Sequence, residues 1–145
     1  MFVVDANLFV HAANPDVDEH EKARRVVNDW RIGGEPWFAT WPILYEFLRI
    51  ATHPKVFERP RTLGQAWEFI EALLASPGFG VLTESERHPA VVRELGAEYP
   101  WLAGSILRDF HTVALMREHG IVEIRTADRD FLHFKHLRVV NPVAG

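Results

Sequence analysis

The sequence predicts an α/β protein with a mostly parallel central sheet of four to five strands and helices on both faces. Three observations support this. Short apolar runs that suit buried strands alternate with amphipathic helical stretches. The apolar runs lack the period-two alternation of a half-exposed strand. Proline, glycine and asparagine separate the segments. The 145 residues suit one core, so we expect residues 1–145 to form a single domain.

The first half of the chain is expected to contain two strands and four helices. The strands are residues 2–4 and 37–40. The helices are residues 7–13, 19–31, 43–52 and 63–74. Asn7 is the expected start of the first helix, and Asp16 or Asp18 the cap of the second. Pro42 suits the first turn of the third helix, and Thr62 caps the fourth.

The second half is expected to contain three strands and two longer helices. The strands are residues 79–82, 122–126 and 137–140. One helix begins at His88-Pro89 and ends near Tyr99-Pro100. The other spans residues 106–119 and stops at Gly120. A turn or short helix is expected at residues 128–131.

Composition excludes several classes of protein. There is no cysteine, which removes disulfides, thiolate zinc sites and cysteine nucleophiles, and fits a cytoplasmic protein. No apolar run approaches the length of a bilayer span, and Met1 leads directly into a predicted strand, so we expect neither a membrane anchor nor a targeting peptide. The net charge of -4 argues against binding nucleic acid by bulk charge alone.

Two acids follow predicted strands. Asp5 ends the first strand, and Asp128 follows the strand at 122–126. In a parallel sheet the carboxyl ends of the strands share one edge, where ligands bind in open α/β folds. We therefore expect these two carboxylates to lie near the same crevice.

Two further acids lie inside helices, where they interrupt apolar faces. Glu46 shares a helix face with Ile43 and Phe47. Asp109 is flanked in the same way by apolar residues of its own helix. An ionised carboxylate on an apolar face is costly unless it is paired or bound to a cation. Both acids lie about one turn into their helices, so we expect them at the same edge of the sheet as Asp5.

The simplest geometry brings Asp5, Glu46, Asp109 and Asp128 together. Oxygen ligands of this kind suit Mg²⁺ or Mn²⁺ rather than zinc. Such ions activate water and stabilise the leaving oxygen in phosphodiester cleavage.

Simpler interpretations of the same residues stay open. Asp128 could only cap a short helix, Glu46 could pair with Arg49, and Asn7 could be only a helix cap. His111, two residues from Asp109, should point about 200° away on an ideal helix and lie outside the site.

The motifs that carry these acids resemble PIN-domain ribonucleases, and more narrowly VapC-type toxins of toxin–antitoxin pairs. The resemblance rests on four segments that occur in the same order along the whole chain. They are Val3-Val4-Asp5-Ala6-Asn7, Tyr45-Glu46-Phe47-Leu48-Arg49-Ile50, Asp109-Phe110-His111-Thr112-Val113-Ala114-Leu115 and Thr126-Ala127-Asp128-Arg129-Asp130-Phe131.

The resemblance implies a PIN-like three-layer sandwich and an endoribonuclease that uses Mg²⁺ or Mn²⁺. By motif position it gives catalytic, metal-binding roles to Asp5, Glu46, Asp109 and Asp128. It gives supporting polar roles to Asn7, Thr126 and Asp130. It also implies a homodimer and a cognate VapB-type antitoxin that inhibits the enzyme.

Basic residues near the third helix are candidates for contacting RNA phosphates. They are Arg49, Lys55, Arg59 and Arg61, and a solvated charged loop is an equally good explanation of them. Two other functions compete with RNA cleavage. One is a non-catalytic PIN-like module that binds RNA or protein. The other is a phosphoaspartyl hydrolase with Asp5 as nucleophile, against which Asn7 stands where a second acid would be needed.

Overall fold

A computed structural model describes residues 1–145 and contains one five-stranded sheet. The strand order is β3-β2-β1-β4-β5, and every neighbouring pair is parallel. The five strands are β1 Phe2–Val4, β2 Trp37–Thr40, β3 Phe79–Leu82, β4 Glu123–Arg125 and β5 Arg138–Val140. The predicted α/β class, the parallel sheet and the strand number are confirmed.

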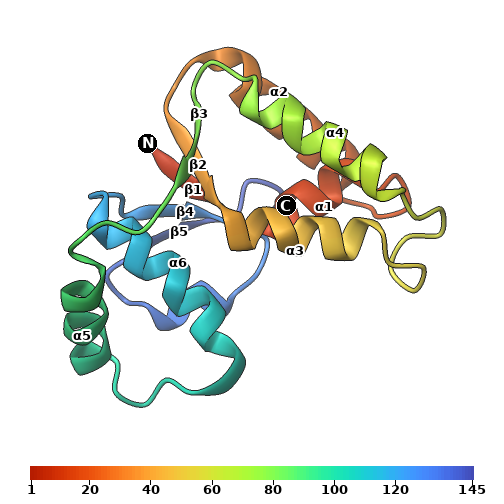
Figure 1. Cartoon of the computed structure of the whole chain (residues 1–145). Helices are drawn as coiled ribbons and strands as arrows, with labels where there is room; N and C mark the ends of the chain where they lie inside the picture. Colours follow the sequence, from red (N-terminus) through yellow and green to blue (C-terminus); the bar gives the residue numbers. More distant parts are fainter.

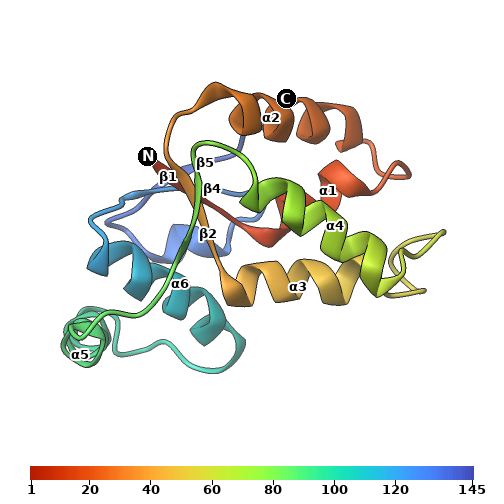
Figure 2. The same ribbon diagram turned by 45° about the horizontal axis from the view of Figure 1, so that its top comes forward.

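Six α-helices connect the strands and cover the sheet. They are α1 Ala6–Ala13, α2 His20–Gly33, α3 Trp41–Ala51, α4 Leu63–Leu74, α5 His88–Glu98 and α6 Leu107–Glu118. Helices α5 and α6 lie together on one side of the sheet, and α1, α2 and α4 lie on the other (Figure 1). Figure 2 shows the same separation after rotation. The helices therefore cover both faces, as a parallel sheet requires.

The parallel arrangement brings the carboxyl ends of β1, β2 and β4 to one edge. Strand β1 lies between β2 and β4, with Val3 opposite Phe38 and Ile124. The backbone N–H of Asp5 extends this pairing by donating to the carbonyl of Arg125 at 3.0 Å. Asp5 and the segment that follows Arg125 therefore lie next to each other at the end of the sheet.

Local capping explains where the helices begin. The Thr40 hydroxyl accepts a hydrogen bond from Ile43 N–H, and Pro42 occupies the first turn of α3. Thr62 and Gln65 form a complete capping box at the start of α4. Gly34 adopts φ 76° just after α2, the left-handed conformation that favours glycine.

Three of the expected helix starts are wrong in detail. Helix α1 is capped by Asp5 rather than started by Asn7, because the Asp5 carboxylate accepts from Ala6 N–H at 2.8 Å. Neither Asp16 nor Asp18 caps α2, whose N-cap is Glu19 without a side-chain hydrogen bond. Helix α6 starts after a short 3₁₀ turn, Gly104–Ile106, instead of running continuously from Ile106.

The core lies between the sheet and the helices on each face. Strand β1 is completely buried, and so is Trp37 at the start of β2. Helix α3 contributes Leu44 and Phe47, neither of which is exposed to solvent. This packing fixes the side of α3 that faces outward, and so the direction in which Glu46 projects.

None of the helices combines the length and the apolar character that crossing a bilayer requires.

Replacing a core leucine of α3 should destabilise the fold much more than replacing an exposed leucine. We expect Leu44→Ala to lower the free energy of unfolding by about 2–5 kcal/mol, because Leu44 is 0% exposed and a cavity would remain. Leu63→Ala is the matched control: Leu63 is 66% exposed, so the change should be within about 0.5 kcal/mol. Urea unfolding measures both, and equal losses would contradict this packing.

Candidate active site

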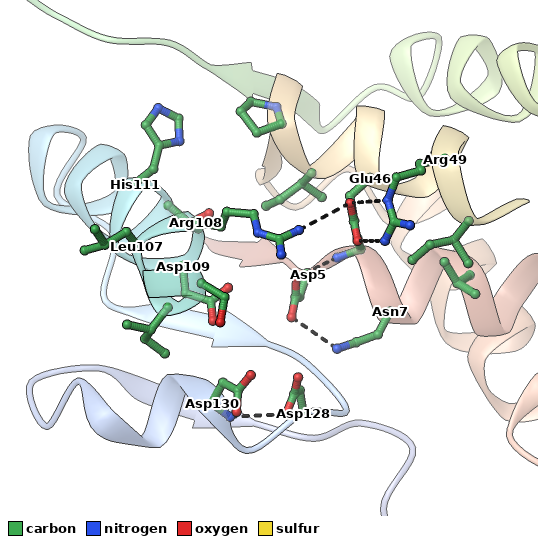
Figure 3. A pocket seen from close by; sticks show the side chains of 18 of the residues that line it. Asp5, Asn7, Glu46, Arg49, Leu107, Arg108, Asp109, His111, Asp128 and Asp130 are labelled. Carbon is green, nitrogen blue, oxygen red and sulfur yellow. Dashed lines mark hydrogen bonds and ion pairs between the residues drawn. The ribbon is translucent and has the colours of Figure 1, made fainter. Parts of the chain in front are cut away.

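The predicted acids line one pocket at the carboxyl edge of the sheet. The pocket has a volume of about 1100 Å³ and lies among α1, α3, the start of α6 and the segment after β4. Five carboxylates line it, those of Asp5, Glu46, Asp109, Asp128 and Asp130. Figure 3 shows them converging from separate elements. The pocket therefore brings together all four of the acids proposed as metal-binding residues, and Asp130 as well.

Asp5 is held in place by hydrogen bonds to both of its carboxylate oxygens. Oδ1 accepts from Ala6 N–H, and Oδ2 accepts from the Asn7 side-chain amide at 3.1 Å and from the Thr126 hydroxyl at 2.9 Å. Burial raises the pKa of Asp5, and the hydrogen bonds from Thr126 and Ala6 lower it again in part. These bonds fix the carboxylate at the end of β1.

Asn7 and Thr126 also hold the segment that carries Asp128. The Asn7 amide donates to the Thr126 hydroxyl at 3.0 Å, and its carbonyl accepts from Ala127 N–H at 3.0 Å. Thr126 is completely buried, and its hydroxyl accepts from Asp128 N–H at 3.0 Å. Asn7 is thus inside α1, where its side chain links the ends of β1 and β4 rather than capping the helix.

Asp128 is exposed and shapes the turn after β4. Its Oδ1 accepts from Arg129 N–H at 2.6 Å and from Asp130 N–H at 3.2 Å. The 3₁₀ helix that follows is Asp130–His133, and no side chain caps it. Asp128 therefore forms a local turn, and Oδ2, which accepts neither of these bonds, remains available at the pocket.

Asp109 lies in the first turn of α6, where its ionisation is disfavoured. Burial is the largest cause, and the negative charge of Asp5 is the next; together they raise the pKa of Asp109 to about 7, from an ordinary value of 3.8. The charges of Asp130 and Asp128 act in the same direction. Burial, reinforced by the neighbouring carboxylates, thus shifts the protonation of Asp109 toward neutral pH.

Glu46 is oriented toward arginine side chains. Arg49 donates to both oxygens of Glu46, at 2.6 and 3.1 Å, and this hydrogen bonding lowers the pKa of Glu46. Arg108 of α6 lies 4.0 Å from the same carboxylate. The pairing with Arg49 that the sequence left open therefore exists, and it neutralises the charge of Glu46.

The donor atoms fit a hard divalent cation. All five carboxylates offer oxygen, and four of them crowd together with an excess of negative charge that a cation would neutralise. No three of the histidine, aspartate and glutamate side chains lie in a geometry that could already hold a metal ion.

The four basic residues proposed for RNA contacts are divided between different places. Arg49 lines the pocket. Arg59 and Arg61 line a second hollow near Phe57, and the Arg61 guanidinium donates to the carbonyl of Ala13 at the end of α1. Lys55 is exposed and lines neither. Of the four, only Arg49 lies beside the acids.

Two basic residues of α6 line the pocket without having been predicted to do so. His111 lines it, contrary to the expectation from helix geometry, because the pocket is lined by several residues of the first turns of α6 and not by the Asp109 face alone. Its ring points away from Asp109 (Figure 3). Its Nε2 pairs with Glu84 Oε1 at 2.6 Å. Arg108 also lines the pocket, and the sequence offered no signal for it beyond its position next to Asp109.

The raised pKa of Asp109 predicts a pH-dependent stability of the metal-free protein. In the unfolded chain this group loses its proton near pH 3.8, whereas the folded protein keeps it up to about pH 7. Between these values the folded state binds more protons, so its stability should fall as the pH rises. Asp109→Asn should flatten this slope in EDTA, as measured by urea unfolding. Asp29→Asn, at an exposed position of α2, should leave the slope intact; an unchanged slope in Asp109→Asn would refute the argument.

Comparison with known sequences identifies the family. A family model described as the PIN domain matches residues 2–137. The ribonuclease VapC48 of Mycobacterium tuberculosis is 33% identical over 141 residues, which cover 97% of this chain and 97% of that protein. These values establish membership in the family.

Solved structures share the fold at much lower sequence identity. The M. tuberculosis toxin VapC20, which cleaves the sarcin-ricin loop, gives a TM-score of 0.64 at 17% identity, with 91% of this chain and 93% of that chain covered. VapBC2 of Rickettsia felis, bound to a DNA fragment from its promoter, gives 0.64 at 11% identity, with 95% and 96% covered. The pocket, the parallel sheet and the sequence match agree: the chain belongs to the PIN-domain family, among the VapC ribonucleases.

Proposed function

We propose that this protein is an endoribonuclease toxin that hydrolyses phosphodiester bonds in cellular RNA with the help of Mg²⁺ or Mn²⁺. The observation that carries the proposal is the convergence of Asp5, Glu46, Asp109 and Asp128 on one pocket. The relatives named ribonucleases support the same reaction. In the non-catalytic alternative the same carboxylates would bind a cation for stability only, and the relatives named ribonucleases do not favour it.

Asp5, Asp109 and Asp128 are the residues proposed to hold the cation, with Glu46 completing the set. A divalent cation supplies polarisation of the phosphoryl oxygen, activation of water and stabilisation of the leaving oxygen. It would also relieve the repulsion that raises the pKa of Asp109. Asp130 adds to the negative charge from its position beside Asp128.

The protein contributes orientation to this chemistry. The bonds from Ala6, Asn7 and Thr126 hold both oxygens of Asp5, so this carboxylate is preorganised before any substrate binds. Arg49 holds Glu46 on the opposite wall of the pocket. Phosphoaspartyl chemistry would need an acid two residues after Asp5, and this position is Asn7. The Asn7 amide instead donates to Asp5 and accepts from Ala127 N–H.

A cognate antitoxin, a homodimer and a cytoplasmic location belong to the same proposal. The structural neighbour from Rickettsia felis is a VapBC pair, which supports a VapB-type partner for this chain. Such a partner would be expected to cover the acidic pocket, since access to these carboxylates is needed for cleavage.

Asp109→Asn should abolish RNA cleavage while the fold survives. Asp109 accepts no hydrogen bond that the fold requires, and removal of its negative charge relieves repulsion from Asp5. We expect a loss at least as large as the roughly 10–100-fold that follows loss of a supporting residue in metal sites. Cleavage of total cellular RNA, with the ends mapped by sequencing, measures the effect.

The matched control is Asp29→Asn, which makes the same chemical change on the exposed face of α2. It should cleave like the wild type. A folded Asp109→Asn protein with full activity would exclude the site, and a wild-type protein that binds RNA without ever cleaving it would favour the binding module instead.

Removal of divalent cations should stop cleavage, and Mg²⁺ or Mn²⁺ should restore it. Binding of a cation to the folded state alone should also raise the melting temperature of the wild-type protein. This rise should be reduced in Asp109→Asn, and Na⁺ at the same ionic strength should not reproduce it. Full activity in EDTA would contradict a role for the cation, and so would a thermal shift that is independent of Asp109.

A further inference from the structure

The pocket contains two arginines, and they differ in how firmly they are held. Arg49 extends from α3 and Arg108 from the first turn of α6. Both approach the carboxylate of Glu46, from opposite sides (Figure 3). Apart from the half-buried His111, no other basic side chain lines the pocket.

Arg49 forms a two-point ion pair with Glu46. Its Nη2 lies 2.6 Å from Oε1 and its Nε lies 3.1 Å from Oε2, a bidentate pair between neighbouring turns of one helix. Planar, two-point contacts of this kind are the stronger type of ion pair. Moving Arg49 to another anion would break both bonds and leave Glu46 without its partner.

Arg108 is only loosely engaged. Its nearest carboxylate oxygen is Oε2 of Glu46 at 4.0 Å, beyond hydrogen-bonding distance, and its side chain is 74% exposed. Exposed ion pairs with this separation contribute little to stability. The Arg108 guanidinium can therefore turn to a new anion at small cost, and all of its donors are free to do so.

An RNA strand that enters this pocket meets five carboxylates and needs a positive group to approach them. Arginine binds phosphate through the same planar fork that it presents to a carboxylate. Arg108 projects over the pocket between Glu46 and Asp109, from the same helix turn as Asp109 (Figure 3). A phosphate bound there would lie beside the acids and not among them.

We propose that Arg108 binds a backbone phosphate of the RNA substrate beside the acidic cluster, while Arg49 serves to hold Glu46 in position. This assignment rests on the proposed function, because it takes RNA as the ligand. It goes beyond the sequence motifs, since Arg108 belongs to none of them. It also separates two arginines that composition alone would treat as equivalent.

RNA binding by cleavage-deficient protein tests the assignment. Asp109→Asn protein, which is expected to keep its fold and lose cleavage, is titrated into a short, fluorescein-labelled single-stranded RNA of mixed sequence, in Mg²⁺ and again in EDTA, at several salt concentrations. Adding Arg108→Gln should weaken binding about tenfold at low salt, the effect of losing one charge-assisted hydrogen bond. It should also reduce the slope of log Kd against log salt by about 0.7, the value for one contact to a single strand. Arg108→Lys should keep most of the slope, because it keeps the charge.

The controls separate a phosphate contact from general electrostatics. Arg24→Gln removes an exposed arginine of α2 that pairs with Glu21 at i,i+3 spacing, as Arg49 pairs with Glu46. It should change neither the RNA affinity nor the salt slope. Arg49→Gln should weaken binding less than Arg108→Gln does. Thermal unfolding establishes that each variant is folded.

Equal binding by the Arg108→Gln and parent proteins would overturn the assignment, as would a larger effect of Arg49→Gln or a complete lack of RNA binding by the parent. Wild-type protein that binds RNA through Arg108 but never cleaves it would instead overturn the proposed function and leave the phosphate contact standing.

Discussion

The hydrogen-bonded link between Asp5, Asn7 and Thr126 is the interaction on which the site depends. Asn7 and Thr126 are 119 residues apart in sequence, yet their side chains meet because β1 and β4 are neighbouring parallel strands. Both oxygens of Asp5 are held, and the turn that carries Asp128 is attached to the same network. The sheet edge thus becomes a rigid base for the other acids, which approach from α3 and α6.

Charge is distributed unevenly over this base. The aspartates crowd together on one side, where burial and mutual repulsion raise the pKa of Asp109 to about 7. Glu46 lies on the other side, where Arg49 keeps its pKa low. The aspartate side of the site therefore has an excess of negative charge that a cation would neutralise. On the Glu46 side the negative charge is already paired with Arg49. Such unfavourable crowding is maintained by the surrounding fold, as is common where function opposes stability.

Short-range sequence signals predicted the architecture well wherever a local interaction decides the structure. Thr62 and Gln65 are close in sequence and cap α4 without help from the rest of the chain. The start of α1 was placed wrongly because Asp5 caps the helix through Ala6 N–H, whereas the side chain of Asn7 binds Thr126 and Ala127 of a distant segment. The position of His111 was misjudged for a related reason: helix geometry gives a direction, but the breadth of the pocket depends on what packs opposite.

The sequence by itself determined the order of strands and helices, the two acids that follow strands and the two acids that interrupt apolar helix faces, because these follow from periodicity and from the cost of burying charge. It also carried the motifs of the PIN-domain family. Only the tertiary structure decided that Asn7 supports Asp5, that Glu46 is paired with Arg49, and that Arg108 reaches the pocket while Arg61 is tied to Ala13. The last two outcomes depend on contacts between distant segments and the first two on side-chain direction, neither of which spacing along the chain specifies.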